Sequence, residues 1–167
     1  MNAHKKGPEL AGITGTSSEE SIQAESLLLK SLFKVPAIFN ELGETIQPAH
    51  FGHLGYGRLF GAMRSGYRDH GKILFGRSIF ALRAGSGMNT APSPDGCRFE
   101  MIRLLAGFVA WWHWPYYAKR VRESAYRRVI IETAEQNAAE AMAGLPLAEL
   151  EANRTTRRMK LEALTHG

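Results

Sequence analysis

Apolar residues recur at helical spacing along most of the chain. Ala24, Leu28 and Leu32 follow one another at intervals of four residues, and such spacing is the main sequence signal of an amphipathic helix. Ser17 and Glu20 have the spacing of a capping box at its start. The same reasoning predicts helices over residues 36–42, 54–70 and 73–84. No segment alternates as a strand does, so we expect an all-α fold.

The second half of the chain predicts a long helical hairpin. Residues 99–112 are strongly apolar and helical in pattern. Pro115 breaks or begins a helix, and a long helix is expected over 116–143 because Gly144 and Pro146 follow it. A more polar helix is expected after these breakers, over 147–164.

These elements predict one folded domain between two tails. Residues 1–17 are rich in Gly, Ser, Thr and charge, and we expect a disordered leader there. The domain then consists of a compact helical bundle (18–84), a loop (85–98) and the helical hairpin (99–143). Residues 144–167 are expected to form a polar C-terminal helix or tail.

The long helix carries two apolar stripes, which are Ala118, Val121, Ala125 and Val129, and Tyr126, Ile130, Ala134, Ala138 and Ala141. A helix that is apolar on two faces needs two packing partners. The other arm of the hairpin covers one face, and a partner subunit is the natural cover for the second. The predicted interface residues are Tyr117, Val121, Tyr126, Arg127, Arg128, Ile130, Ala134 and Ala138.

The order of charges along this helix agrees with a partner helix. Basic residues crowd its first half and acidic residues its second half, which opposes the helix dipole. An antiparallel copy would align the basic half with the acidic half. A solvated face with no functional meaning explains the same order equally well.

Composition narrows the class of protein. The chain has 167 residues and a net charge of +5, which permits contact with nucleic acid or an acidic partner without requiring it. Cys97 is the only cysteine, so no disulfide can form within the chain. The N-terminus has no apolar signal core and no stretch is long enough to span a membrane. We therefore expect a cytoplasmic protein without a membrane partner.

No constellation of residues indicates an active site. His50 and His53 lie three residues apart, but no third metal ligand accompanies them. Asp69 and His70 are neighbours in a predicted helix and point apart. Gly71-Lys72 is not part of a phosphate-binding loop, and the pattern G-x-x-x-x-G-K-[ST] does not occur in this chain. We expect no enzymatic activity of its own, no cofactor and no metal.

One aromatic run has two interpretations. Trp111, Trp112, Trp114, Tyr116 and Tyr117 lie beside basic residues, as in surfaces on which nucleic-acid bases stack. The favoured interpretation is that these rings fill the core at the turn of the hairpin, because buried aromatic rings contribute large apolar areas.

Three groups of residues resemble the N-terminal domain of DnaB-type replicative DNA helicases. The first is Ser21-Ile22-Gln23-Ala24-Glu25 with Leu28, Leu29 and Leu32. The second is Ile46, Pro48, Phe51, Leu59, Phe60, Ala62 and Met63, followed by Gly71-Lys72. The third and most specific is Tyr117-Ala118, Val121-Arg122-Glu123, Ala125, Arg127-Arg128, Val129-Ile130 and Ala134. The resemblance extends over roughly residues 18–143.

The chain also departs from this family. Tyr56 and Gly57 stand where the family has histidine and arginine, Phe75 replaces an acidic cap, and the tryptophan cluster at 111–114 is unusual. The ATPase domain of the family, with its phosphate-binding loop, is not encoded in these residues.

The resemblance implies a role in DNA replication. In that family this domain dimerises through its helical hairpin, builds the collar of the hexameric helicase and contacts primase and loading factors. We therefore expect a homodimer or higher oligomer that binds a replicative helicase, a primase or a helicase loader. The alternative is a small basic DNA-binding protein or helicase regulator that uses the Arg-rich helix, with a weak DNA contact.

Overall fold

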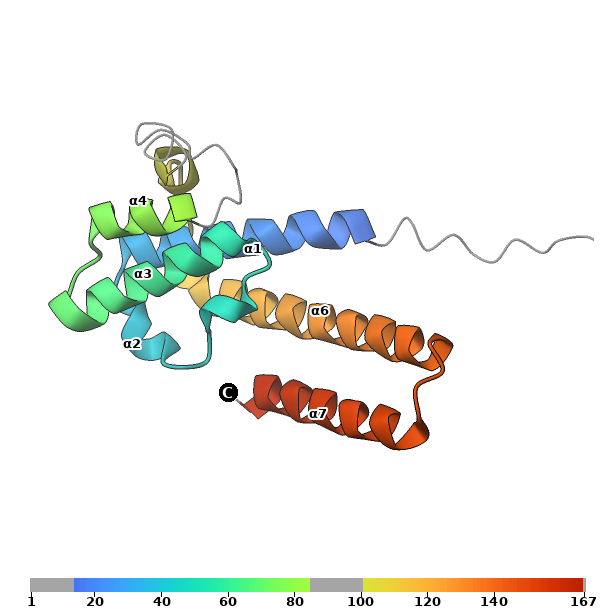
Figure 1. The fold of residues 1–167 in the computed structure, drawn as a ribbon. Coiled ribbons are helices and arrows are strands. Elements are labelled where there is room, and N and C mark those ends of the chain that lie inside the picture. Colours follow the sequence, from blue (N-terminus) through green and yellow to red (C-terminus); the bar gives the residue numbers. More distant parts are fainter. Residues whose placement is uncertain (1–13, 85–100, 167) are drawn as a thin grey trace, which may run out of the picture.

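The computed structural model describes residues 14–84 and 101–166, and the regular structure within them is entirely helical (Figure 1). The elements are α1 (Thr14–Lys34), α2 (Ile38–Leu42), η2 (Pro48–His50), α3 (Leu54–His70), α4 (Phe75–Ala84), η3 (Trp111–His113), α6 (Trp114–Met142) and α7 (Leu147–His166). A helical turn also covers residues 101–105. The described ranges contain no strand, which confirms the prediction of an all-α fold.

One hydrophobic core unites both halves of the chain. Leu28, Leu29 and Leu32 of α1 are fully buried, as the helical spacing predicts. They belong to the same core as Phe60 of α3 and Val121 of α6. The first half of α6 is therefore part of the bundle, and the bundle extends beyond residue 84.

Helix α3 owes its position to glycine. The helix begins after His53, whose side chain accepts a hydrogen bond from the backbone N–H of Tyr56 at 3.2 Å. It ends at His70, and the C-cap residue Gly71 has a φ of 66°, in the left-handed region that favours glycine. A Cβ on Gly57 would lie 2.5 Å from the backbone oxygen of Pro48. Glycine at this position thus allows η2 to lie directly on α3.

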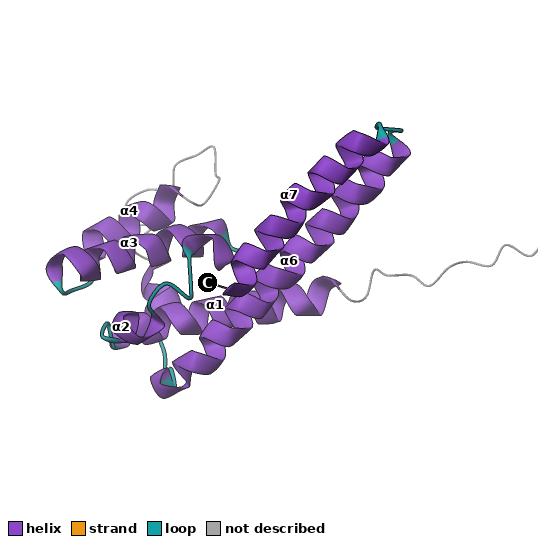
Figure 2. Cartoon of the chain, turned by 90° about the horizontal axis from the view of Figure 1, so that it is seen from below, coloured by secondary structure: helices purple, strands orange, loops and turns teal. Residues whose placement is uncertain are grey.

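The hairpin is built from different segments than the sequence suggests. Residues 101–105 are helical but residues 106–110 are not, and Gly107 takes a φ of 87° that a continuing helix does not allow. Met101, Leu104 and Val109 instead enter the bundle core. The second half of α6 pairs with α7, so the long hairpin comprises α6 and the polar C-terminal helix (Figure 2).

The expected tails are only partly described. Helix α1 begins at Thr14, so the helix includes residues 14–17, which we assigned to a disordered leader. The rest of that leader, residues 1–13, and the expected loop at 85–98 lie outside the described residues. The polar C-terminal helix forms and runs to His166.

Candidate functional site

The buried carboxylate of Glu25 links α1 to the turn that precedes α3. Glu25 of α1 has a fully buried side chain. One of its carboxylate oxygens accepts a hydrogen bond from the backbone N–H of Gly52 at 2.7 Å, and the other accepts one from that of His53 at 3.1 Å. Burying a charge is costly unless it is paired and hydrogen-bonded, and these backbone donors supply part of the compensation.

Arg128 of α6 completes this group of contacts, which we call the Glu25–Arg128 node. Its guanidinium lies 3.9 Å from Glu25 Oε1 and donates a 2.6 Å hydrogen bond to the backbone oxygen of His50. A Cβ on Gly52 would lie 2.8 Å from Arg128 Nη1 and 3.3 Å from Glu25 Oε1. A side chain at residue 52 would therefore require the Arg128 guanidinium to shift, so glycine favours this arrangement.

The node connects the first and the third groups of residues that resemble the helicase domain. Glu25 comes from the first group and Arg128 from the third, 103 positions later in the sequence. Sequence reasoning placed Arg128 at a subunit interface and gave Glu25 no role. An arginine held by a buried carboxylate and a backbone carbonyl serves the fold of its own chain.

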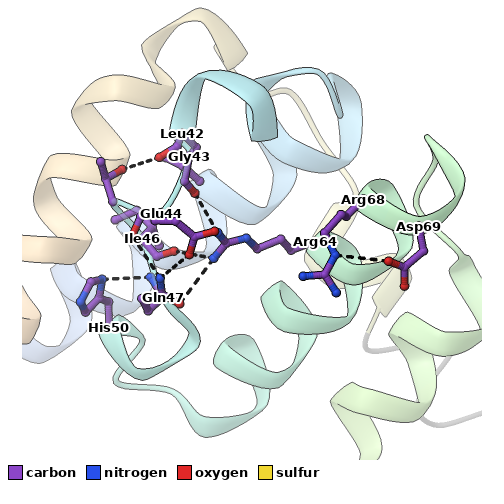
Figure 3. A network of polar contacts seen from close by, with 10 residues as sticks. Leu42, Gly43, Glu44, Ile46, Gln47, His50, Arg64, Arg68 and Asp69 are labelled. Atoms are coloured by element: carbon purple, nitrogen blue, oxygen red, sulfur yellow. Dashed lines mark hydrogen bonds and ion pairs between the residues drawn. The ribbon is translucent and has the colours of Figure 1, made fainter. Parts of the chain in front are cut away.

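A second polar network holds the segment between α2 and η2 (Figure 3). Arg64 of α3 forms an ion pair with Glu44 and donates hydrogen bonds to the backbone oxygens of Gly43 at 3.0 Å and Ile46 at 3.3 Å. Hydrogen bonds from Gln47, and then from Arg64, hold the pKa of the Glu44 carboxyl below its usual range. This segment is thereby fixed against α3.

His50 terminates this network on its buried side. Its Nδ1 accepts a hydrogen bond from the backbone N–H of Gln47 at 3.1 Å. Burial lowers the pKa of His50, and the positive charges of Arg122 and Arg128 lower it further. The neutral ring is thus the form that this structure stabilises, and His50 packs inside the fold.

The α6–α7 hairpin has a polar seam. Arg157 of α7 pairs with Glu140 of α6, with one contact at 2.9 Å, and also donates a hydrogen bond to the side-chain oxygen of Asn137. Asn153 donates a further hydrogen bond to Glu140 at 3.2 Å. No described side chain of α7 is buried. Polar contacts therefore carry much of this pairing, and apolar burial contributes little.

Large apolar side chains remain exposed on the hairpin, namely Tyr126, Ile130, Ile131, Met142, Leu147 and Met159. Ile130 is 42% exposed and Ile131 is 53% exposed. Covering the exposed half of such a side chain contributes about 1 kcal/mol. Packing of α7 on α6 thus leaves a surface that a further partner can cover.

The predicted interface residues fall into two sets, apart from Arg128, which is partly buried and bound to Glu25 and the His50 oxygen. Tyr117 and Val121 are buried against the bundle, which leaves neither side chain available to a partner. The exposed set consists of Tyr126, Arg127, Ile130, Ala134 and Ala138. The sequence reasoning missed Ile131, because it lies on neither of the two apolar stripes.

The aromatic run is divided in a similar way. Tyr117 is buried, and Trp111 and Trp114 pack against the core. Trp112 is 53% exposed and Tyr116 is 59% exposed. Filling of the core therefore accounts for only part of the run.

A groove lies between α2 and the start of α6. Its walls include Leu42, Thr45, Trp114, Ala118 and Tyr126. Lys119, Arg122, Glu41 and Glu123 also line it, so charges of both signs are present. Sequence patterns within one helix gave no signal for this groove, because its two walls are far apart in the chain.

The other candidate residues do not form a reaction centre. Asp69 is hydrogen-bonded to Ser65 at 3.1 Å and paired with Arg68 at 3.2 Å. No group of three His, Cys, Asp or Glu side chains suited to a metal ion occurs among the described residues. None of the described helices combines the length and apolarity that a membrane crossing requires.

A comparison with known protein families and with curated proteins finds no match to this chain. The three groups of residues named above therefore remain the basis of the resemblance to the helicase domain.

Proposed function

We propose that this chain is an interaction and oligomerisation module of the DNA replication machinery, similar to the N-terminal collar domain of DnaB-type helicases. It associates with a second copy through the α6–α7 hairpin. The observation that carries this proposal is the exposure of Tyr126 and Ile130, two apolar side chains that lie four residues apart on one face of α6. The contact between Glu25 and Arg128 supports the resemblance, because these residues belong to its first and third groups and together hold α1 and α6 in place.

The charges of the hairpin support the same association. Glu140 is paired with Arg157, and Lys119 lies 3.8 Å from Glu123. For Arg127, Glu132 and Glu135 the described residues provide no ion-pair partner. An antiparallel second copy brings Arg127 near Glu135, so charge sets the orientation while apolar burial contributes most of the affinity.

The direct test is to place a charge on the proposed interface. Ile130→Asp buries an unpaired carboxylate only if a partner covers this position, so the variant should be monomeric. Gln136→Asp adds the same charge to an exposed position of the same helix and should remain associated. Light scattering coupled to gel filtration measures the mass, and circular dichroism shows whether the hairpin is retained. An Ile130→Asp protein that keeps the mass of the unmodified chain contradicts the proposal.

The replication partners require a separate measurement. Immobilised protein is exposed to a purified replicative helicase, its loader and its primase, and binding is followed by interferometry. We expect at least one of them to bind, with little dependence on salt because the contact is mainly apolar. Binding that decreases steeply with salt and extends equally to duplex DNA would instead favour the alternative of a basic DNA-binding protein. The structure lends that alternative little support, because Arg128 and Arg120 are already paired with Glu25 and Glu20.

A further inference from the structure

The segment that leads into α6 exposes large aromatic side chains. Phe108 is 78% exposed, Trp112 is 53% exposed and Tyr116 is 59% exposed. These residues constitute what we call the aromatic patch. Their exposure is not explained by the bundle core, which takes other rings from the same run. It is not explained by the proposed hairpin interface either, because that surface lies on the second half of α6.

The rings of the patch are held in place by one another. The rings of Phe108 and Trp112 meet edge to face with their centroids 6.1 Å apart, and Trp111 braces Trp112 in the same manner at 5.8 Å. Tyr116 follows Trp112 by four residues in a helical run that passes from η3 directly into α6. The Tyr116 ring meets that of the buried Tyr117 edge to face, with the centroids 6.0 Å apart. The patch is therefore a preorganised surface of aromatic rings.

A positive charge lies at the patch. The Lys34 ammonium lies 5.8 Å from the centre of the Phe108 ring. Residues 101–122 contain no acidic residue, and neither do residues 26–40 of α1 and the turn that follows it. Arg120 is paired with Glu20 and lies 3.8 Å from Glu123, which is also 3.8 Å from Lys119. The cation that lies at the patch itself is Lys34. The partner that suits this charge is an anion.

We propose that the aromatic patch binds single-stranded nucleic acid, with bases stacked on its rings and phosphates near Lys34. Exposed rings flanked by cations are the usual elements of such surfaces, because every base has a face that can stack. A protein partner fits less well, since the centres of protein interfaces are depleted in lysine. A bilayer surface fits less well, because it takes up a continuous apolar helix face, whereas His113 and Lys119 interrupt this one. The inference goes beyond the proposed function and does not depend on the hairpin.

The test uses the full chain and a fluorescently labelled oligo-deoxythymidine of about 20 nucleotides, a length that covers several bases per site. Fluorescence anisotropy should show binding at low salt. Trp112→Ala should weaken binding at least about fivefold, the effect of losing one stacked base. Leu54→Ala is the control, since this apolar side chain is 60% exposed and lies at the start of α3, outside the patch, so its loss should leave affinity unchanged. Phe108→Ala repeats the test at the most exposed ring, where truncation removes the least from the fold.

Several outcomes would overturn the proposal. One is the absence of oligonucleotide binding at about 50 mM salt. Another is equal affinity of the unmodified protein for a duplex of the same length, because paired bases offer no free face. A third is an unchanged affinity in both Trp112→Ala and Phe108→Ala. Binding that depends on Trp112 but occurs only to vesicles of phosphatidylserine and phosphatidylcholine would assign the patch to membranes. Repeating the titration with Ile130→Asp separates this site from the hairpin, because a monomer should retain the dependence on Trp112.

Discussion

Replacing Glu25 by glutamine should destabilise the whole domain. The carboxylate accepts hydrogen bonds from the backbone N–H groups of Gly52 and His53 with separate oxygens. A glutamine amide can accept only one of them and presents its NH₂ group to the other. Leaving one buried donor unpaired costs about 1–3 kcal/mol. Loss of the charge opposite Arg128 adds to this cost, so the expected total is about 2–4 kcal/mol.

Urea unfolding followed by circular dichroism measures this loss. With a slope of about 2 kcal/mol per molar urea, the midpoint should decrease by about 1–2 M. All proteins are compared at one concentration, because association would itself raise stability. The matched control is Glu44→Gln, which removes the carboxylate of a pair whose acidic partner is 79% exposed and should change stability by less than about 0.5 kcal/mol.

The single variants Glu25→Gln and Arg128→Met, together with the double variant, show whether the two residues of the node act together. Arg128→Met should also cost about 2–3 kcal/mol, because the backbone oxygen of His50 loses its charged donor. The double variant Glu25→Gln/Arg128→Met should cost clearly less than the sum of the single changes. Additive effects, or a change below about 0.5 kcal/mol for Glu25→Gln, would refute the view that Glu25 and Arg128 hold α1 and α6 together.

Three further predictions follow from individual contacts. The lowered pKa of His50 means that the unfolded chain binds a proton first as pH falls, so stability should be complete above about pH 6.5 and decrease below it. His50→Gln should reduce this dependence in urea unfolding at different pH values. Gly57→Ala should destabilise the protein in thermal unfolding, because its Cβ meets the Pro48 oxygen. Gly76→Ala, whose Cβ meets nothing within 4 Å, should stabilise it by about 0.5 kcal/mol. Arg157→Ala should increase amide hydrogen exchange throughout α7, whereas Arg158→Ala, at an 80% exposed side chain, should not.

The bundle helices could be predicted because their apolar spacing reports burial directly. The expected helix over 54–70 forms with the same bounds, and Gly71 terminates it. In α1 the spacing of Leu28 and Leu32 identified the buried face. These features depend on local sequence, because regular apolar spacing indicates the buried face of a helix and a glycine after it indicates where the helix ends.

The hairpin was assigned to the wrong pair of segments for a physical reason. Residues 99–112 are apolar, and we took their apolarity for the face of a long helix. Gly107 ends the helical course there, and Met101 and Val109 fill the bundle core instead. Helix α7 pairs with α6 through Arg157, Glu140 and Asn153, and apolar periodicity does not detect a polar seam.

Local sequence patterns could not predict the Glu25–Arg128 node or which aromatic rings are exposed. Glu25 resembles any helical glutamate until the backbone of Gly52 and His53 is placed over it. The exposure of Trp112 and the burial of Tyr117 likewise depend on where η3 meets α1. Only the three-dimensional arrangement distinguishes such residues from their neighbours.

Sedimentation equilibrium of the unmodified protein tests the central claim most directly. The account predicts a dimer or higher oligomer at tens of micromolar, about the range in which a modest interface is occupied. The association should persist at moderate salt, because apolar side chains such as Ile130 and Ile131 contribute most of it. A monomer across this concentration range would contradict self-association through the α6–α7 hairpin.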